Sequence, residues 1–155
     1  MHVHEVTEDE LFGAIEESGA RALLIGRRAM VAIGFPVLTA DYDFWIHIDD
    51  IEAFNGALRG LEMLPSKTPE EARKRGRYVI ENGEHIDVLV ARSVTALDGD
   101  VVRFEDIWAA RVELAIGDAI GHVPSLADLI RTKRFSARDK HVADLRMLLS
   151  RMNEP

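Results

Sequence analysis

Residues 39–48 run TADYDFWIHI, and this stretch decides the fold that the sequence predicts. Its second part, Phe44 to Ile48, is rich in aromatic and β-branched residues, which favours a strand. Asp41 and Asp43 stand at the start of that strand, two residues apart. Because side chains alternate between the two faces of a strand, both carboxylates are expected to project from the same face.

A third acid lies in a second predicted strand, residues 85–90, which run HIDVLV. The apolar side chains there alternate with Asp87, so Asp87 faces away from the side that they bury. If the two strands pair, three carboxylates converge, and a divalent cation such as Mg²⁺ is the simplest way to stabilise them beside a triphosphate. The spacing alone favours a plainer alternative, a turn residue at Asp41 and ordinary polar strand positions at Asp43 and Asp87.

The segments around these acids alternate between helices and strands. Thr7 and Glu10 form a capping box for a first helix that stops at Gly19. The apolar run Ala22 to Ile25 predicts a buried strand that Gly26 ends. The further predicted elements are a helix from Arg27 to Ile33, one capped by Asp49 or Asp50, a short one after Thr68, a hairpin of 78–80 and 86–90 around Asn82-Gly83, a connection over 95–100, a helical turn over 104–110, a hairpin of 112–116 and 119–123, a helix over 126–134 capped by Ser125, and a last helix over 138–152.

This mixture predicts an α+β fold in a single domain over 1–155, with a core at about 21–92 and a helical C-terminal part at about 124–152. The chain has 155 residues, a net charge of -8 and no cysteine. Disulfides, thiolate zinc sites and cysteine nucleophiles are therefore excluded. The first residues resemble no secretory signal and no stretch suits a membrane span, which predicts a cytoplasmic protein that binds no membrane.

Two basic clusters stand out against this acidic composition. One is Arg73 to Arg77, and the other extends from Arg131 to Lys140. Either cluster suits a triphosphate or an RNA backbone, and either also suits a solvated surface. Within the second cluster, Asp144 follows Lys140 by four residues, the spacing of a helical ion pair.

The order of these features resembles the DNA polymerase beta-like nucleotidyltransferase superfamily, and most closely its small bacterial members related to abortive-infection toxins. The resemblance rests on a strand that ends in Gly26, the run from Gly34 to Asp43, the Ile86-Asp87-Val88 triplet, and a C-terminal pattern of a serine-capped helix with Lys133 and an arginine-led helix that starts at Arg138. It covers residues 21–150. It implies a mixed β-sheet with flanking helices and a short helical C-terminal part.

The resemblance also implies an activity, the transfer of a nucleoside monophosphate (NMP) from a nucleoside triphosphate (NTP) such as ATP to a hydroxyl acceptor. Asp41, Asp43 and Asp87 would hold two Mg²⁺ ions, and Asp87 would be the base. Nucleotide contacts would come from Gly26, Arg27, Thr39, Lys133 and Arg138. The acceptor is a small molecule, RNA or protein, and the toxin-like relatives add an antitoxin as a partner.

Some positions depart from the family pattern. Arg27 replaces the glycine or serine that usually follows Gly26, Val37 replaces an arginine, and His141 replaces an aspartate. Arg27 is expected either to contact a phosphate or, without metal, to lie across the cleft as a counter-ion of the aspartates. The alternative to an enzyme is therefore a catalytically degenerate protein of the same fold that binds a nucleotide or a partner.

Overall fold

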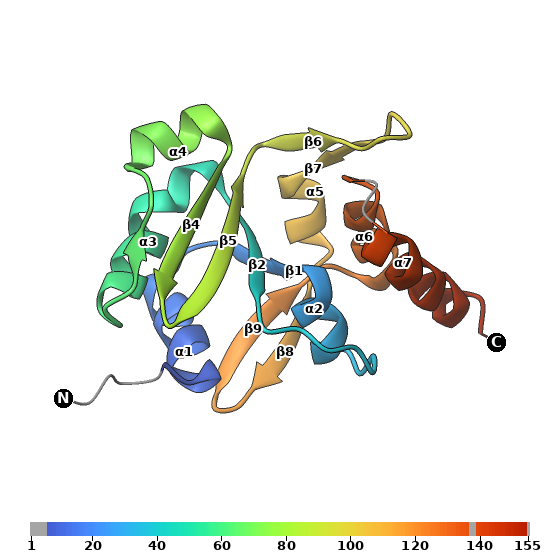
Figure 1. The fold of residues 1–155 in the computed structure, drawn as a ribbon, viewed down its shortest axis with the longest axis horizontal. Coiled ribbons are helices and arrows are strands. Elements are labelled where there is room, and N and C mark those ends of the chain that lie inside the picture. The colour runs from blue at the N-terminus through green and yellow to red at the C-terminus, as the bar shows by residue number, and fades with distance from the viewer. Residues whose placement is uncertain (1–5, 137–138, 155) are drawn as a thin grey trace.

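The computed structural model describes residues 6–136 and 139–154, and its main sheet has five strands in the order β1-β2-β5-β4-β3. β2 and β5 run parallel, and every other neighbouring pair in this sheet is antiparallel. The strands are β1 (Ala22–Ile25), β2 (Tyr42–Ile46), β3 (Leu64–Pro65), β4 (Arg77–Asn82) and β5 (Glu84–Val90). The predicted mixed sheet of an α+β fold is confirmed, and Figure 1 shows helices on both of its sides.

Helices and short hairpins surround this sheet. The helices are α1 (Glu8–Ser18), α2 (Gly26–Ala32), the 3-10 turn η1 (Ile48–Asp50), α3 (Ile51–Arg59), α4 (Pro69–Arg75), α5 (Phe104–Ala109), α6 (Leu126–Lys133) and α7 (Asp139–Met152). The hairpins are β6 (Ser93–Thr95) with β7 (Val101–Arg103), and β8 (Val112–Ile116) with β9 (Ala119–Val123). Among the described residues, no helix is long and apolar enough to cross a membrane.

One face of the sheet carries the main hydrophobic core. Phe44 of β2 points to this face and packs against Phe12 of α1 and Phe54 of α3, with ring centroids 5.7 and 5.6 Å apart. All three aromatic rings are almost fully buried. Burial of aromatic side chains of this size contributes much of the stability of a core, so α1 and α3 are fixed on this face.

The opposite face is covered over only part of its area. Leu23 of β1, Trp45 of β2 and Leu89 of β5 form a second buried cluster with Phe104 and Ile107 of α5. Two residues earlier in β2 and β5, the same face instead presents the side chains of Asp43 and Asp87. In Figure 1, α5, α6 and α7 lie on the other side of the sheet from α1 and α3. The polar part of this face is therefore left for a site.

The helix caps follow the sequence with one exception. Thr7 and Glu10 form the predicted capping box of α1, and Thr68 forms a second one with Glu71 at α4. Asp50, predicted as a cap of α3, makes no capping bond, because its carboxylate instead accepts hydrogen bonds from Arg21.

The segment 95–100 is a connection, as the sequence predicts, but it joins two short strands that the sequence does not predict. It lies within the β6–β7 hairpin, whose two strands have three residues each. Strands this short show no usable alternation of apolar residues. Their position is fixed by tertiary packing, because Val102 is buried in the second cluster.

Candidate active site

The three predicted acids line one cleft of about 500 Å³. Asp43 and Asp87 are register partners across the parallel pair of β2 and β5, so their side chains leave the same face of the sheet. Asp41 lies just before β2, is exposed, and lines the same cleft. The two predicted strands pair, and Asp43 and Asp87 share a face as expected for that case. Asp41, expected on the same strand face as Asp43, lies before the strand begins, so the alternation does not apply to it.

The other predicted site residues reach this cleft from several directions. Gly26 and Arg27 come from the start of α2, Thr39 from the loop before β2, and Lys133 from the end of α6. Arg138 lies outside the described residues. Every predicted site residue that the structure describes thus lines the same cavity.

Gly26 is adjacent to the carboxylate of Asp43. It has a φ of +69°, and a Cβ added there would lie 2.5 Å from Oδ2 of Asp43. Both the left-handed backbone and the lack of space require glycine at this position. The glycine that ends β1 therefore lets Asp43 occupy the base of the cleft.

Thr39 shapes the loop that carries Asp41. The backbone N–H of Asp41 donates to the Thr39 hydroxyl at 3.2 Å, and that hydroxyl donates to the Asp41 carbonyl at 3.3 Å. This local turn orders the two residues before β2 begins. Thr39 is therefore placed to position Asp41.

Asp87 has a histidine beside it. Nε2 of His85 lies 3.3 Å from Oδ2 of Asp87, and Nδ1 of the same ring lies 3.0 Å from Oε1 of Glu81. Partial burial by itself lowers the pKa of His85, but the charges of Asp87 and Glu81 and their hydrogen bonds outweigh it and raise this pKa above its ordinary value. His85 is thus a built-in partner of the third acid.

Arg27 does not pair with the three aspartates. Its Nε and one terminal nitrogen donate to the two carboxylate oxygens of Asp144 in α7, both at 3.1 Å, and its other terminal nitrogen donates to the Leu38 carbonyl. The expectation that Arg27 is their counter-ion is wrong, because the buried carboxylate of Asp144 offers it a two-pronged partner instead.

Lys133 shares that carboxylate. Its Nζ lies 3.0 Å from Oδ2 of Asp144, and both side chains are almost completely buried. Burial lowers the pKa of Lys133, partly offset by Asp144, while the two cations hold the pKa of Asp144 below its ordinary value although burial opposes this. The Asp144 partners are thus Arg27 and Lys133; the side chain of its predicted partner, Lys140, lies outside the described part.

The cleft has the oxygen ligands that a magnesium ion needs, but these ligands are not arranged around one position. Carboxylate oxygens are the ligands that Mg²⁺ prefers, and Asp43 and Asp87 stand side by side on one face of the cleft. Among the residues that the structure describes, no group of three acidic or histidine side chains is close enough to hold a metal ion. The donor set therefore fits Mg²⁺ in its chemistry, and the carboxylates would have to move closer together to hold the ion.

The cleft also contains residues that the sequence analysis did not assign to the site. Arg77 at the start of β4 lines it, as do Ser136 and His141, which hydrogen-bond to each other through Oγ and Nδ1 at 2.8 Å. Asp144 does not line the cleft but holds Arg27 and Lys133, which do. The sequence offered a signal for Arg77, which lies in the first basic cluster, and for His141, which stands where the family pattern has an aspartate.

Trp45 in β2 and His47 just after this strand have structural roles. Trp45 is fully buried, and its indole N–H donates to the Ala91 carbonyl at 2.9 Å. His47 is buried beyond the end of β2, with one ring nitrogen accepting from the Asp49 N–H and the other 2.6 Å from Glu105. Neither lines the cleft that the three acids share.

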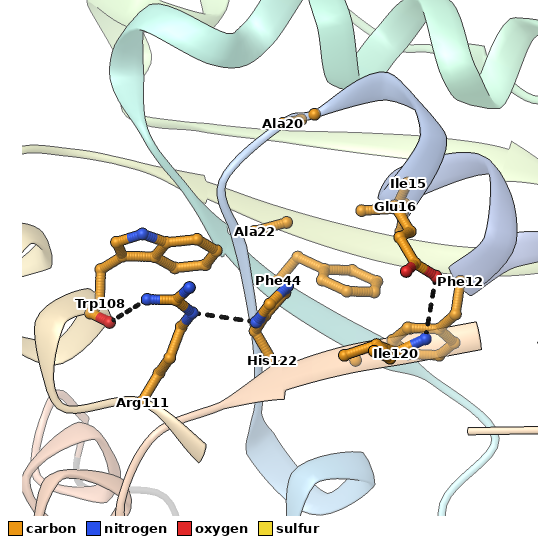
Figure 2. Close-up of a pocket in the computed structure, with 12 residues that line it drawn as sticks. Phe12, Ile15, Glu16, Ala20, Ala22, Phe44, Trp108, Arg111, Ile120 and His122 are labelled. Atoms are coloured by element: carbon orange, nitrogen blue, oxygen red, sulfur yellow. Dashed lines mark hydrogen bonds between the residues drawn. The ribbon is translucent and has the colours of Figure 1, made fainter. Parts of the chain in front are cut away.

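A smaller cavity of about 120 Å³ lies between α1, β1 and β9 (Figure 2). Its polar groups bind one another, since Arg111 donates to both His122 and the Trp108 carbonyl, and the Ile120 N–H donates to Glu16. Phe12 and Phe44 supply much of its apolar wall. None of the predicted site residues lines it, so the larger cleft is the candidate active site.

Similar solved structures share the fold. No protein-family model and no curated protein matches the chain. The crystal structure of ANT(2")-Ia in complex with adenylyl-2"-tobramycin matches with a TM-score of 0.65 and 13% identity, over 93% of this chain and 86% of that one. The lincomycin-bound lincosamide antibiotic adenylyltransferase LnuA matches with a TM-score of 0.62 and 15% identity, over 95% and 99%. The chain thus has the fold of these nucleotidyltransferases.

Proposed function

We propose that this protein is a magnesium-dependent nucleotidyltransferase that moves an NMP from an NTP to a hydroxyl acceptor. One observation carries the proposal: Asp43 and Asp87 are register partners on the sheet face that opens into a 500 Å³ cleft, which Gly26, Thr39, Asp41 and Lys133 also line. The shared fold with two adenylyltransferases supports it.

The β1 and α6 side of the cleft suits the triphosphate. Lys133 lies close enough to Asp43 for their charges to interact, and Arg27 stands beside it. Both are cations that can turn from Asp144 toward phosphate oxygens. Arg138 is proposed as a further contact from the sequence pattern alone.

The β5 side of the cleft suits the acceptor. In an in-line displacement the acceptor hydroxyl forms a new bond to the α-phosphorus while the bond to pyrophosphate breaks. Asp87 is the carboxylate placed to take the hydroxyl proton, with His85 beside it. Asp41, Asp43 and Asp87 would hold two Mg²⁺ ions, which when bound neutralise the charge of the carboxylates and the triphosphate.

The second candidate function is a degenerate protein of this fold that binds a nucleotide or a partner such as an antitoxin. It is favoured by Asp144, which engages both Arg27 and Lys133, and by the absence of a preassembled metal cluster among the described residues. A toxin role and a cytoplasmic location belong to the same set of proposals. The single-domain arrangement, with 124–152 closing the core at 21–92, serves either candidate.

Pyrophosphate release tests the two candidates. The protein is incubated with each labelled NTP, Mg²⁺ and an acceptor mixture of RNA, protein and hydroxyl-bearing drugs. The enzyme predicts pyrophosphate and a labelled acceptor, both lost in excess chelator and in Asp43→Asn. Binding of an NTP, measured by calorimetry, without any pyrophosphate would favour the degenerate protein instead.

A further inference from the structure

Arg77 is a cation of the cleft that the proposed reaction does not yet use. It is exposed, lines the cleft, and its side chain makes no hydrogen bond or ion pair with any residue that the structure describes. The two other arginine or lysine side chains of the described cleft wall, Arg27 and Lys133, are both held by Asp144. In the resting protein, Arg77 is thus the available guanidinium of the described cleft.

The sheet register fixes where Arg77 lies relative to the acids. Arg77 pairs with Leu89 and Val79 pairs with Asp87 across β4 and β5, so Arg77 shares a face with Asp87 and is its diagonal neighbour. Such neighbours are about 7–8 Å apart at their Cα atoms, within reach of an arginine side chain. Even so, the ion-pair partner of Asp87 is His85, not Arg77.

The strand order separates Arg77 from the triphosphate side. From β1 to β4, the cleft presents Gly26 and Arg27, then Asp43, then Asp87, then Arg77. Asp87 therefore lies between the cations proposed for the NTP and Arg77. A molecule that reaches Asp87 from the β4 side meets Arg77 first.

Two more cationic side chains precede Arg77 in the sequence. Lys74 and Arg75, in the last turn of α4, are exposed and form no ion pair with a described residue. Arg73, by contrast, is held by Glu52 and by the Ile48 carbonyl. Residues 73–77 thus form a basic stretch in a protein whose net charge is -8.

We propose that the acceptor is a hydroxyl compound that carries a phosphate near its reacting hydroxyl, and that Arg77 binds this phosphate. The inference rests on the proposed function and adds the chemical class of the acceptor. A guanidinium binds a phosphate through paired hydrogen bonds, and the same charge repels a polyamine acceptor such as tobramycin. The 3′ end of an RNA and a phosphorylated sugar share this chemistry.

The test measures acceptor binding and transfer separately. The probes are a short oligoribonucleotide with a free 3′ hydroxyl, ribose 5-phosphate, tobramycin and lincomycin. Binding is measured by calorimetry with a non-hydrolysable NTP analogue and Mg²⁺ present, and transfer by pyrophosphate release. The variants are Arg77→Ala and, as a control, Arg59→Ala, an exposed arginine of α3 that does not line the cleft.

We expect a phosphate-bearing probe to bind, and Arg77→Ala to weaken it by about tenfold or more while leaving NTP affinity unchanged. Binding should also weaken as salt rises. Tighter binding of the oligoribonucleotide than of ribose 5-phosphate would indicate that the phosphate belongs to an RNA, and the reverse would indicate a phosphorylated sugar.

Three results would overturn the inference: tighter binding of tobramycin or lincomycin than of the phosphate probes, no binding of either phosphate probe, or a loss of affinity in Arg77→Ala that is confined to the NTP. If pyrophosphate is released with tobramycin or lincomycin, the nucleotidyltransferase function stands and only the acceptor class is wrong. If a phosphate probe binds but no transfer occurs, only the nucleotidyltransferase function is contradicted.

Discussion

Arg27, which lines the cleft, and Asp144, 117 positions away in the sequence, meet in a two-pronged ion pair. Lys133 donates to the same carboxylate. The three side chains come from α2, α7 and α6, so this contact ties the helical C-terminal part to the sheet core. Because Asp144 is almost fully buried, its charge depends on both cations.

Asp144→Asn is expected to destabilise the protein by about 3–5 kcal/mol, because it leaves Lys133 buried without a charge partner. Urea unfolding at pH 7 measures the loss. The control is Asp100→Asn, which removes an exposed partner of Arg131 and should cost far less. Equal losses in the two variants would contradict the structural role of Asp144.

The same contact predicts how stability depends on acid. The pKa of Asp144 lies below its usual 3.8, since the hydrogen bonds from Arg27 and Lys133 outweigh the effect of burial. Its contribution is therefore complete above about pH 4 and is lost as the pH falls through the folded-state pKa. Urea midpoints from pH 7 to pH 3 should fall in both proteins, since the pKa of Asp50 and of other carboxylates is lowered too, but they should fall less in Asp144→Asn.

The sequence predicts this contact only in part. Local patterns were enough for the Thr7 capping box and the hairpin at Asn82-Gly83, because each depends on residues a few positions apart. The shared face of Asp43 and Asp87 also needed the pairing of β2 with β5, which the sequence analysis took only as a condition. The Arg27–Asp144 pair depends on how α7 packs, and no local pattern encodes that. Arg27 was accordingly assigned the wrong partner.

Gly26→Ala is expected to strain the backbone and, in addition, to disturb the site around Asp43. A left-handed φ costs a residue other than glycine about 1–2 kcal/mol, and the added Cβ would also displace the Asp43 carboxylate, which lies 2.5 Å away. The matched control is Gly83→Ala, with a φ of +76° and nothing within 4 Å of the added Cβ. Both variants should lose stability in urea unfolding, but only Gly26→Ala should lose metal-dependent NTP binding. Equal NTP binding by both would show that Asp43 tolerates the displacement.

His85 is expected to titrate above 6.5, its ordinary value, because the charge of Asp87 outweighs partial burial. Since the folded-state pKa is raised, protonated His85 favours the folded protein below pH 6.5, and this small contribution disappears as the pH rises through the folded-state pKa. An NMR titration of the ring protons measures the midpoint. In Asp87→Asn the midpoint should fall, and an unchanged midpoint would show that Glu81 alone holds the proton.

Asp43→Asn and Asp87→Asn are expected to abolish most transfer without unfolding the protein. The two carboxylates are neighbours on one face, and like charges repel, so removing one should leave the melting temperature unchanged or slightly raised. Transfer should fall by about 100-fold or more, since each variant removes a proposed metal ligand and Asp87→Asn also removes the base. Pyrophosphate release is the readout, and Asp118→Asn, in the β8–β9 turn outside the cleft, is the control. A stable variant that keeps wild-type release would remove that aspartate from the proposed active site, whereas a fall in melting temperature would mean that its charge is structural.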